Sequence, residues 1–297
     1  MPSQPALSIC QLSIPDTSFD DDLLLIKEAG AGGISIAEHK VVEFDAQLRS
    51  FERSGIKASS CIPQNISPLP VKPSYVYPGP TDFGERVDLM CASIERLAPF
   101  EPDSIVMLTG SAQGYQPKEA WSMAVDGLRT ASRAAEANNT RIALEVCRGD
   151  VGADFTFLRT LEDAIRFIDE VGSDSVGLCY DLYHLWDTAN ILEDSEKYGS
   201  RIFTVQYSDW REPARCAADR VLPGDGSIDF PALIRALQRG GYDGWWDFEI
   251  FSDDGRWGTE LPDSLWKMPY PDLLSQGQNG FLAAWRQAQI PATAARS

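Results

Sequence analysis

The chain has little histidine and little positive charge, and both shortages narrow its chemistry. Its 297 residues include 2 histidines, and 26 Lys and Arg stand against 44 Asp and Glu, giving a net charge of −18. A zinc centre built from several histidines is therefore excluded by number. Nucleic-acid binding depends on clustered basic residues that displace counterions, so DNA and RNA are not expected partners.

Other common signals are also missing. No apolar run reaches the roughly 18 residues of a membrane-spanning helix, and no basic segment followed by an apolar stretch opens the chain as in a secretory signal. We therefore expect a cytoplasmic protein with no membrane partner. The six cysteines include no C-x-x-C pair, which favours reduced core thiols. There is no G-x-G-x-x-G or P-loop motif for a nucleotide.

What the chain does have is a regular alternation. Short apolar runs rich in β-branched residues alternate with longer amphipathic stretches, as in repeated βα units around a parallel sheet. This pattern predicts a single (β/α)8 TIM barrel over residues 1–290, followed by a flexible tail at 291–297. The eight predicted strands are Leu7–Leu12, Gly33–Ala37, Ile56–Ile62, Ser104–Leu108, Arg141–Val146, Val176–Tyr180, Arg201–Tyr207 and Gly244–Ile250.

Two predicted connections are too long to be simple turns. They are Pro63–Asp82, after the third strand, and Phe251–Tyr270, after the eighth. In a parallel barrel both lie on the face formed by the carboxyl ends of the strands, where active sites are built. We expect them to form a lid or pocket walls, with an oligomer contact or surface decoration as the alternative.

Four late strands end in oxygen-bearing side chains. Glu145, Asp181, Gln206 and Glu249 lie at the ends of the fifth to eighth predicted strands. A carboxylate at an apolar strand end is costly unless it is paired or bound to a cation. Together the four predict a cage for one divalent ion, and oxygen ligands favour Mg2+, Mn2+ or Co2+. Taken singly, each acid fits a helix cap or an ion pair equally well.

The motifs around these residues resemble those of the xylose-isomerase-like barrel family of sugar isomerases and epimerases, including its tagatose-3-epimerase and keto-inositol branches. The likeness covers nearly the whole chain. Its most specific pieces are Ala143-Leu144-Glu145, Asp181-x-x-His184, Val205-Gln206-x-x-Asp209, Pro223-Gly224-Asp225-Gly226-x-Ile228-Asp229-Phe230, and Gly241-Tyr242-x-Gly244 leading to Glu249.

The resemblance implies roles for particular residues. Glu145, Asp181 and Glu249 would bind the metal, the two glutamates would act as acid and base, and His184 would contact the substrate or a ligand. It also implies a homo-oligomer. Gln206 is a departure, since many epimerases of the family have histidine there and the dehydroshikimate-dehydratase branch is similar in having glutamine.

Several activities share such a cage. A divalent ion on a carbonyl oxygen stabilises the enediolate formed when a carboxylate removes the α-proton, which predicts an isomerase or epimerase of a small keto-sugar or inositol-type polyol. A lyase is the alternative, either a keto-polyol dehydratase or an eliminase of a 3-keto-glycoside. An abasic-site endonuclease is disfavoured by the charge, and a sugar-binding barrel without activity by the presence of Glu145 and Glu249.

Other residues are candidate substrate contacts on the same face. We predict that His184 orients substrate or moves a proton, with a hydrogen-bonded supporting histidine as the alternative. His39 is expected to bind substrate or act as an acid or base, and otherwise to be a loop residue. Arg211 either binds a hydroxyl or carboxylate, or pairs with a neighbouring acid. Trp210 and Trp257 are predicted to stack on a sugar. No glycine-rich phosphate turn follows the last strands, so the polyhydroxylated substrate is expected to be unphosphorylated.

Overall fold

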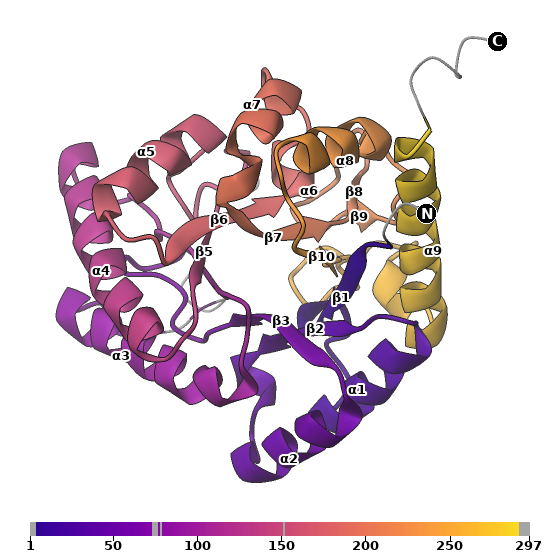
Figure 1. The fold of residues 1–297 in the computed structure, drawn as a ribbon, viewed down its shortest axis with the longest axis horizontal. Helices are drawn as coiled ribbons and strands as arrows, with labels where there is room; N and C mark the ends of the chain where they lie inside the picture. The colour runs from indigo at the N-terminus through magenta and orange to yellow at the C-terminus, as the bar shows by residue number, and fades with distance from the viewer. Residues whose placement is uncertain (1–3, 73–76, 78, 151, 291–297) are drawn as a thin grey trace.

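The computed structural model describes residues 4–72, 77, 79–150 and 152–290, and the predicted tail at 291–297 lies outside them. Within the described residues, eight parallel strands close into a barrel in the order β1-β10-β7-β6-β5-β4-β3-β2. Figure 1 shows the helices as a ring around these strands. The predicted (β/α)8 TIM barrel is confirmed.

Every predicted strand forms one stave of the barrel, with its ends moved by two residues or fewer. Two further short strands, which were not predicted, pair antiparallel outside the barrel: β8 (Asp209–Trp210) and β9 (Arg220–Val221). The barrel strands are β1 (Ala6–Cys10), β2 (Gly33–Ala37), β3 (Lys57–Ile62), β4 (Ile105–Met107), β5 (Ile142–Glu145), β6 (Val176–Asp181), β7 (Ile202–Tyr207) and β10 (Trp245–Phe248).

The helices begin and end where capping residues stand. Thr160 accepts from the Asp163 amide at the start of α5, and Gly55 and Gly172 end α2 and α5 in the left-handed conformation. The short α6 was not predicted. The helices are α1 (Phe19–Glu28), α2 (Phe44–Ser54), α3 (Phe83–Leu97), α4 (Pro117–Ala137), α5 (Leu161–Val171), α6 (Leu182–Leu185), α7 (Ile191–Tyr198), α8 (Phe230–Arg239) and α9 (Tyr270–Ala288).

Apolar side chains gather in two layers. The larger cluster fills the space between the strands and the surrounding helices. The smaller one lies inside the barrel and includes Ile62, Val106, Ala143 and Cys179. Because side chains alternate along a strand, the same staves that pack outward against helices also turn residues into the barrel. The inward residues at the ends of the strands are therefore the ones that reach the mouth.

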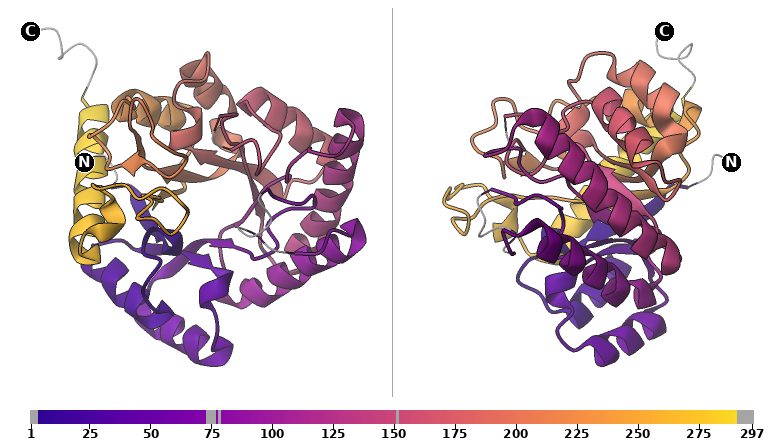
Figure 2. Two further views of the ribbon diagram at one scale, coloured as in Figure 1. Left: turned by 180° about the vertical axis from the view of Figure 1, so that it is seen from behind. Right: turned by 90° about the vertical axis from the view of Figure 1, so that its left-hand side faces the viewer.

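The loops at the carboxyl ends of the strands cover the mouth. Figure 2 shows the segments after β7 and β10 extending from the same side of the ring. Part of the first long connection packs on β4, since Leu108 donates its amide to Ile66 and Leu69 to Thr109. Leu69 and Val71 are fully buried, so this stretch is a wall of the barrel mouth.

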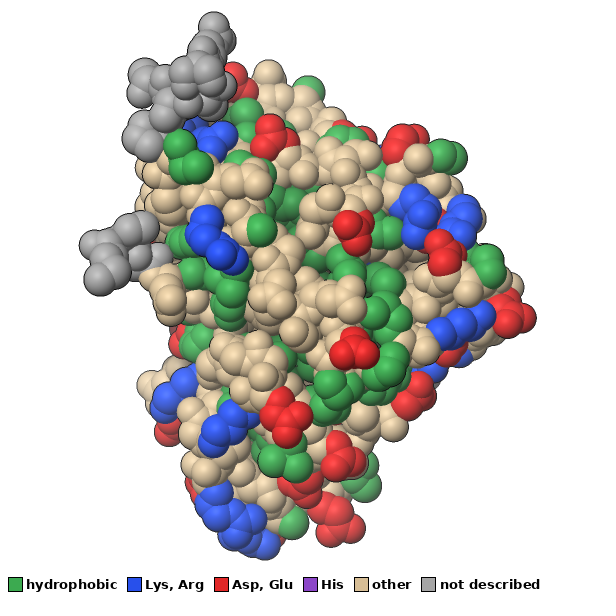
Figure 3. All heavy atoms as spheres, turned by 90° about the vertical axis from the view of Figure 1, so that its right-hand side faces the viewer, with side chains coloured by type: hydrophobic (Ala, Val, Ile, Leu, Met, Phe, Trp, Pro, Cys, Tyr) green, Lys and Arg blue, Asp and Glu red, His purple; other side chains and the backbone are tan. Residues whose placement is uncertain are grey.

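The outer surface carries charges of both signs. On the face shown in Figure 3, acidic and basic side chains are scattered among apolar ones. Among the described residues, no helix is both long enough and apolar enough to cross a membrane.

Candidate active site

The structure brings the four predicted ligands together at the carboxyl ends of neighbouring strands. Asp181 on β6 is the register partner of Gln206 on β7, and Glu249 directly follows β10. The amide Nε2 of Gln206 donates to Glu249 Oε1 at 2.9 Å. Asp181, Gln206 and Glu249 are buried, with exposed fractions of 0%, 1% and 4%. We call Glu145, Asp181, Gln206 and Glu249 the oxygen cage.

An arginine that sequence reasoning missed reaches into the cage. Arg220 Nη1 lies 3.1 Å from Asp181 Oδ2 and 3.3 Å from Glu249 Oε2. Its guanidinium stands over the rings of Tyr183 and Phe251, at 4.3 and 4.6 Å from their centroids. It is 3% exposed. A planar, permanently charged group at this depth supplies the positive charge that buried carboxylates require.

A folded loop holds Arg220 in place. Arg220 pairs with Trp210 between β9 and β8, and its amide donates to the carbonyl of Phe251. Asp209 fixes the following turn, because its carboxylate accepts from the amides of Gly224, Gly226 and Ile228 at 2.8 to 3.0 Å. Two motifs of the sequence, the one that ends at Asp209 and the turn that begins at Pro223, therefore stabilise the loop that carries Arg220.

Burial raises the pKa of Glu145, Asp181 and Glu249 above the usual carboxylate range, and that of Glu249 reaches about 7. Repulsion from neighbouring acids adds to the rise for the two glutamates, while the charge of Arg220 opposes it for all three. Two buried carboxylates and the partly buried Glu145 share one guanidinium, so the set carries excess negative charge when all three acids are ionised. A divalent cation fits this set, because it would relieve that excess.

His184 is the predicted catalytic histidine, and the structure places it beside the cage. Its Nε2 lies 3.7 Å from Asp181 Oδ2 and 3.9 Å from Glu145 Oε1. Burial, followed by the nearby charges of Arg220 and Arg148, lowers the pKa of His184 well below its usual value. The imidazole is therefore neutral at physiological pH.

Thiols and a phenol complete the surroundings of the cage. Cys10 Sγ lies 3.5 Å from Glu249 Oε1, and Cys179 Sγ lies 3.1 Å from Gln206 Oε1. Burial raises the pKa of Tyr77, and the charges of Glu249 and Glu145 add to the rise, so this phenol stands near both acids. Tyr77 was missed because no periodic pattern marks it within its proline-rich loop.

The other predicted substrate contacts are placed outside the cage. Trp210 is buried with the Arg148 guanidinium 3.9 Å from its ring centroid, and Trp257 is 51% exposed beside Trp266. His39 is exposed just after β2. Arg211 pairs with two acids, at 3.0 Å from Asp219 and 3.1 Å from Asp263, so the structure shows the ion-pair alternative for this residue.

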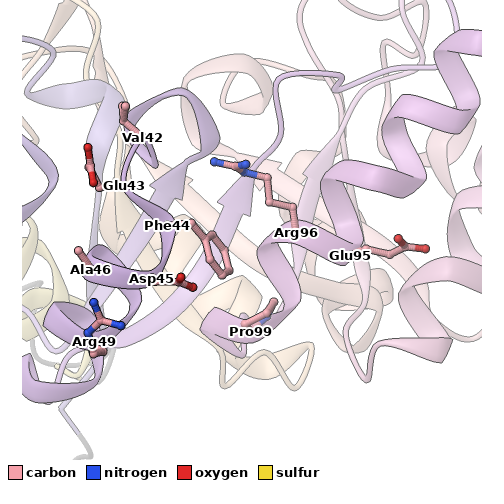
Figure 4. A pocket seen from close by; sticks show the side chains of 9 residues that line it. All are labelled: Val42, Glu43, Phe44, Asp45, Ala46, Arg49, Glu95, Arg96 and Pro99. Atoms are coloured by element: carbon pink, nitrogen blue, oxygen red, sulfur yellow. The ribbon is translucent and has the colours of Figure 1, made fainter.

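A hollow lies on the outer ring, beside the start of α2. It has a volume of about 800 Å3 and is open between α2 and the end of α3. Figure 4 shows Phe44 and Arg96 facing each other across it, and Arg96 also donates to the carbonyl of Val41. Both acids and arginines line the hollow, and none of the residues of the oxygen cage does.

Comparison with known proteins gives consistent matches. The family model described as xylose isomerase-like TIM barrel matches residues 23–270. A probable ketose 3-epimerase of Synechocystis is 26% identical over 86% of this chain and 85% of its own length. A D-psicose 3-epimerase of Enterocloster bolteae is 30% identical over 50% of this chain, and the match spans 46% of that enzyme.

Other matching curated proteins are named inosose isomerase or inosose dehydratase. Among solved structures, an IOLI protein described with a bound zinc atom superimposes with a TM-score of 0.76. It is 20% identical, and the match covers 96% of this chain and 100% of that one. At this identity the structural likeness supports the fold alone.

Proposed function

The chain belongs to the family of xylose isomerase-like TIM barrels, and from this premise we propose that it is a divalent-metal-dependent isomerase or epimerase of a small, unphosphorylated keto-sugar or inositol-type polyol. The observation that carries the proposal is the convergence of Glu145, Asp181, Gln206 and Glu249 at the barrel mouth, where Arg220 contacts Asp181 and Glu249, and His184 lies beside Glu145 and Asp181. The names of the matched relatives, ketose epimerases and inosose isomerases, support the same class of substrate.

The oxygen cage would hold the ion. When bound, Mn2+, Mg2+ or Co2+ supplies a Lewis acid that stabilises negative charge developing on a substrate oxygen. The Gln206 side chain takes part through its carbonyl oxygen, which requires the amide to turn from its present hydrogen bonds with Cys179 and Glu249. The zinc-bound structural neighbour supports a divalent ion in a barrel of this shape.

The chain's own side chains move the proton. Glu249, with its pKa raised to about 7 in the metal-free protein, is suited to accept a proton near neutral pH and return it. Glu145 faces the same point from β5 and acts on the opposite side of the substrate carbon. Removal of the α-proton by one glutamate and its return by the other gives the epimer through an enediolate.

Arg220 and His184 bind the substrate and do not exchange protons with it. The guanidinium of Arg220 already bridges Asp181 and Glu249, so it can turn one donor toward a substrate hydroxyl while keeping the acids paired. His184 is neutral, and it therefore offers one nitrogen donor or acceptor to the substrate without adding a charge. The buried apolar cluster inside the barrel limits the access of water to the cage from below.

The test is exchange of the substrate α-proton. In deuterated water, with a panel of unphosphorylated ketoses and inososes, we expect chelation to abolish turnover, divalent metal to restore it, and deuterium to enter the product. The variant Glu249→Gln should lose the exchange, whereas Glu52→Gln, an exposed acid on α2, should keep it. Full retention of an α-deuterium label through turnover would exclude this mechanism.

A lyase is the second candidate, favoured by one residue of the cage. Gln206 is a neutral ligand that neither carries a proton nor strengthens a base, and some matched relatives are named inosose dehydratase. Loss of a β-hydroxyl or glycosyl oxygen after α-proton removal would then give the product. Mass spectrometry separates the two activities, because isomerisation leaves the mass unchanged and elimination releases water or an aglycone.

A further inference from the structure

Three different metal-binding groups meet beside the oxygen cage. A carboxylate oxygen of Glu145, the Cys147 thiol and a ring nitrogen of His184 all lie within 4.8 Å of one another. The Cys147 Sγ to Glu145 Oε1 distance is 3.7 Å, and the His184 Nε2 to Glu145 Oε1 distance is 3.9 Å. Glu145 ends β5, Cys147 follows two residues later, and His184 comes from α6 after the next strand.

The two distances to Glu145 are close to those between neighbouring ligands of a tetrahedral metal site, and the third pair lies within 4.8 Å. Zinc bonds of about 2.0–2.2 Å to nitrogen and oxygen and about 2.3 Å to sulfur put neighbouring ligand atoms roughly 3.3–3.6 Å apart. The pairs that include Glu145 exceed this spacing by a few tenths of an ångström, which a small side-chain rotation removes. Three protein ligands with one open position are also the usual arrangement of a catalytic zinc site.

The unpartnered ring nitrogens of His184 give an independent sign of ligand binding at this position. The side chain is 9% exposed, and its Nδ1 is buried without a hydrogen-bond partner among the described residues. Its Nε2 is 3.7 Å or more from the two acids it faces, which is too far for a good hydrogen bond. A buried imidazole with both nitrogens unsatisfied is costly, and a cation on one of them removes part of that cost.

Cys147 is closely packed in this position. It is 4% exposed, and a side-chain carbon added at Gly152 would lie 2.2 Å from its Cβ, so the loop backbone covers the thiol. Arg159 also donates to the carbonyl of Cys147 at 3.2 Å. The thiol is therefore shielded from bulk solvent, and its hydrogen-bond partner is the carboxylate of Glu145.

We propose that Glu145, Cys147 and His184 form a second metal position, which takes a thiophilic divalent cation such as Zn2+ or Co2+ and shares Glu145 with the oxygen cage. Cys147 binds as the thiolate, and its proton passes to solvent as the metal enters. Sulfur and nitrogen donors select these metals over Mg2+, which prefers oxygen. This position goes beyond the proposed function, because it does not require the oxygen cage to be filled.

The test is a Co2+ titration of the full chain, followed by absorption spectroscopy. Thiolate coordination gives an intense ligand-to-metal charge-transfer band in the near ultraviolet, which oxygen and nitrogen ligands do not. We expect the wild-type protein to show this band and Cys147→Ser to lack it. Cys179→Ser is the matched control, since Cys179 is equally buried and also lies beside the cage, yet it faces Gln206; it should keep the band.

Zn2+ affinity provides a second readout that does not depend on activity. Loss of a direct ligand should weaken binding by about 100-fold or more, given that loss of an outer-sphere partner alone costs about 10–100-fold. Isothermal titration should therefore show weaker Zn2+ binding for Cys147→Ser and for His184→Gln, with normal far-ultraviolet circular dichroism confirming that each variant is folded. Cys179→Ser should bind as the wild type does.

The outcomes separate this inference from the proposed function. Asp181→Asn should weaken the oxygen cage and leave the charge-transfer band intact, because Asp181 is not a ligand of the second position. Co2+ binding without the band, or a band that survives in Cys147→Ser, would overturn the second position and leave the oxygen cage standing. If neither Co2+ nor Zn2+ binds the wild-type chain, both proposals are wrong.

Discussion

Strand β10 and the residue that follows it carry two buried acids, Asp247 and Glu249, at two depths of the barrel, and their surroundings differ. Glu249, at the mouth, lies 3.3 Å from the guanidinium of Arg220 and accepts from Gln206. Asp247, one layer deeper, accepts from the hydroxyl of Ser8, and its Oδ2 has no hydrogen-bond partner among the described residues. Both are 4% exposed or less.

Burial raises the pKa of both acids, but a cation stands beside only one of them. For Glu249 the charge of Arg220 limits the rise to about 7, whereas for Asp247 burial is opposed mainly by the Ser8 hydrogen bond and the pKa rises well above its usual value. The comparison indicates that this barrel keeps an ionisable carboxylate where a cation is available, and a neutral carboxylic acid where none is.

The largest expected effect is a loss of turnover when Glu249 is replaced. Replacing Glu249 by Gln removes the proposed proton acceptor, and we expect activity to fall by about 10²–10⁴-fold, the usual contribution of general acid–base catalysis. Asp247→Asn should change activity by only a few fold, because the neutral acid does not reach the mouth. Steady-state kinetics of the two variants, after each is confirmed to be folded, makes the comparison. Equal losses in both would mean that depth in the barrel does not separate their roles.

The second effect concerns Arg220, the positively charged side chain of the site. Arg220→Met leaves Asp181 and Glu249 buried without their partner, and we expect the metal-free protein to lose about 3–5 kcal/mol of unfolding free energy. Adding Mn2+ should recover part of this loss, since a divalent ion supplies the missing positive charge. Denaturant unfolding with and without metal measures both quantities.

Arg256→Met is the matched control for Arg220. This arginine also contacts two acids, Asp16 and Asp254, but it lies on the surface with 28% of its side chain exposed. Its loss should cost about 1 kcal/mol or less. A similar cost for both variants would show that Arg220 is not the counter-charge of the cage.

The third effect is a pH dependence of the metal-free protein. The folded-state pKa of Glu249 is about 7, above its ordinary value of 4.5, so the folded state binds more protons between these limits. Unfolding free energy must therefore fall as the pH rises from about 4.5 through about 7, and the raised pKa values of Glu145 and Asp181 act in the same direction. Saturating metal, which keeps the carboxylates ionised, should remove this fall. Denaturant titrations at several pH values test it, and a rise over the same interval would contradict it.

Some residues of the site at the barrel mouth could be predicted from the sequence and others could not. The difference depends on whether the residue lies in a strand or in a loop. Glu145, Asp181 and Gln206 are the late residues of apolar strands, so periodicity alone puts them at the mouth. Arg220 belongs to a two-residue strand within a loop, 39 positions from Asp181, and no local pattern marks it. Only the folded loop brings it into the cage.

The interaction partners of the loop side chains could also not be predicted from local sequence patterns. Arg211 was open to substrate binding or to an ion pair, and the outcome depends on Asp263, which is 52 positions away. Trp210 was predicted to stack on a sugar, yet its ring packs against Arg148 and Tyr183. Loop residues acquire their partners from other loops, and such pairings leave no periodic signal in the sequence.

The smallest expected effect is on the unfolding free energy when Asp247 is replaced. The sign of this effect tests the comparison of Asp247 with Glu249 most directly. Asp247→Asn keeps an oxygen that can accept from Ser8, so we expect unfolding free energy to change by about 2 kcal/mol or less. Because the folded-state pKa of Asp247 is raised, the wild-type protein loses stability as the pH rises above about 4, whereas the amide does not titrate. The variant should therefore gain stability relative to the wild type between about pH 4 and 7. If denaturant unfolding shows a constant difference between variant and wild type over this interval, Asp247 is already ionised in the folded barrel, and its contrast with Glu249 is wrong.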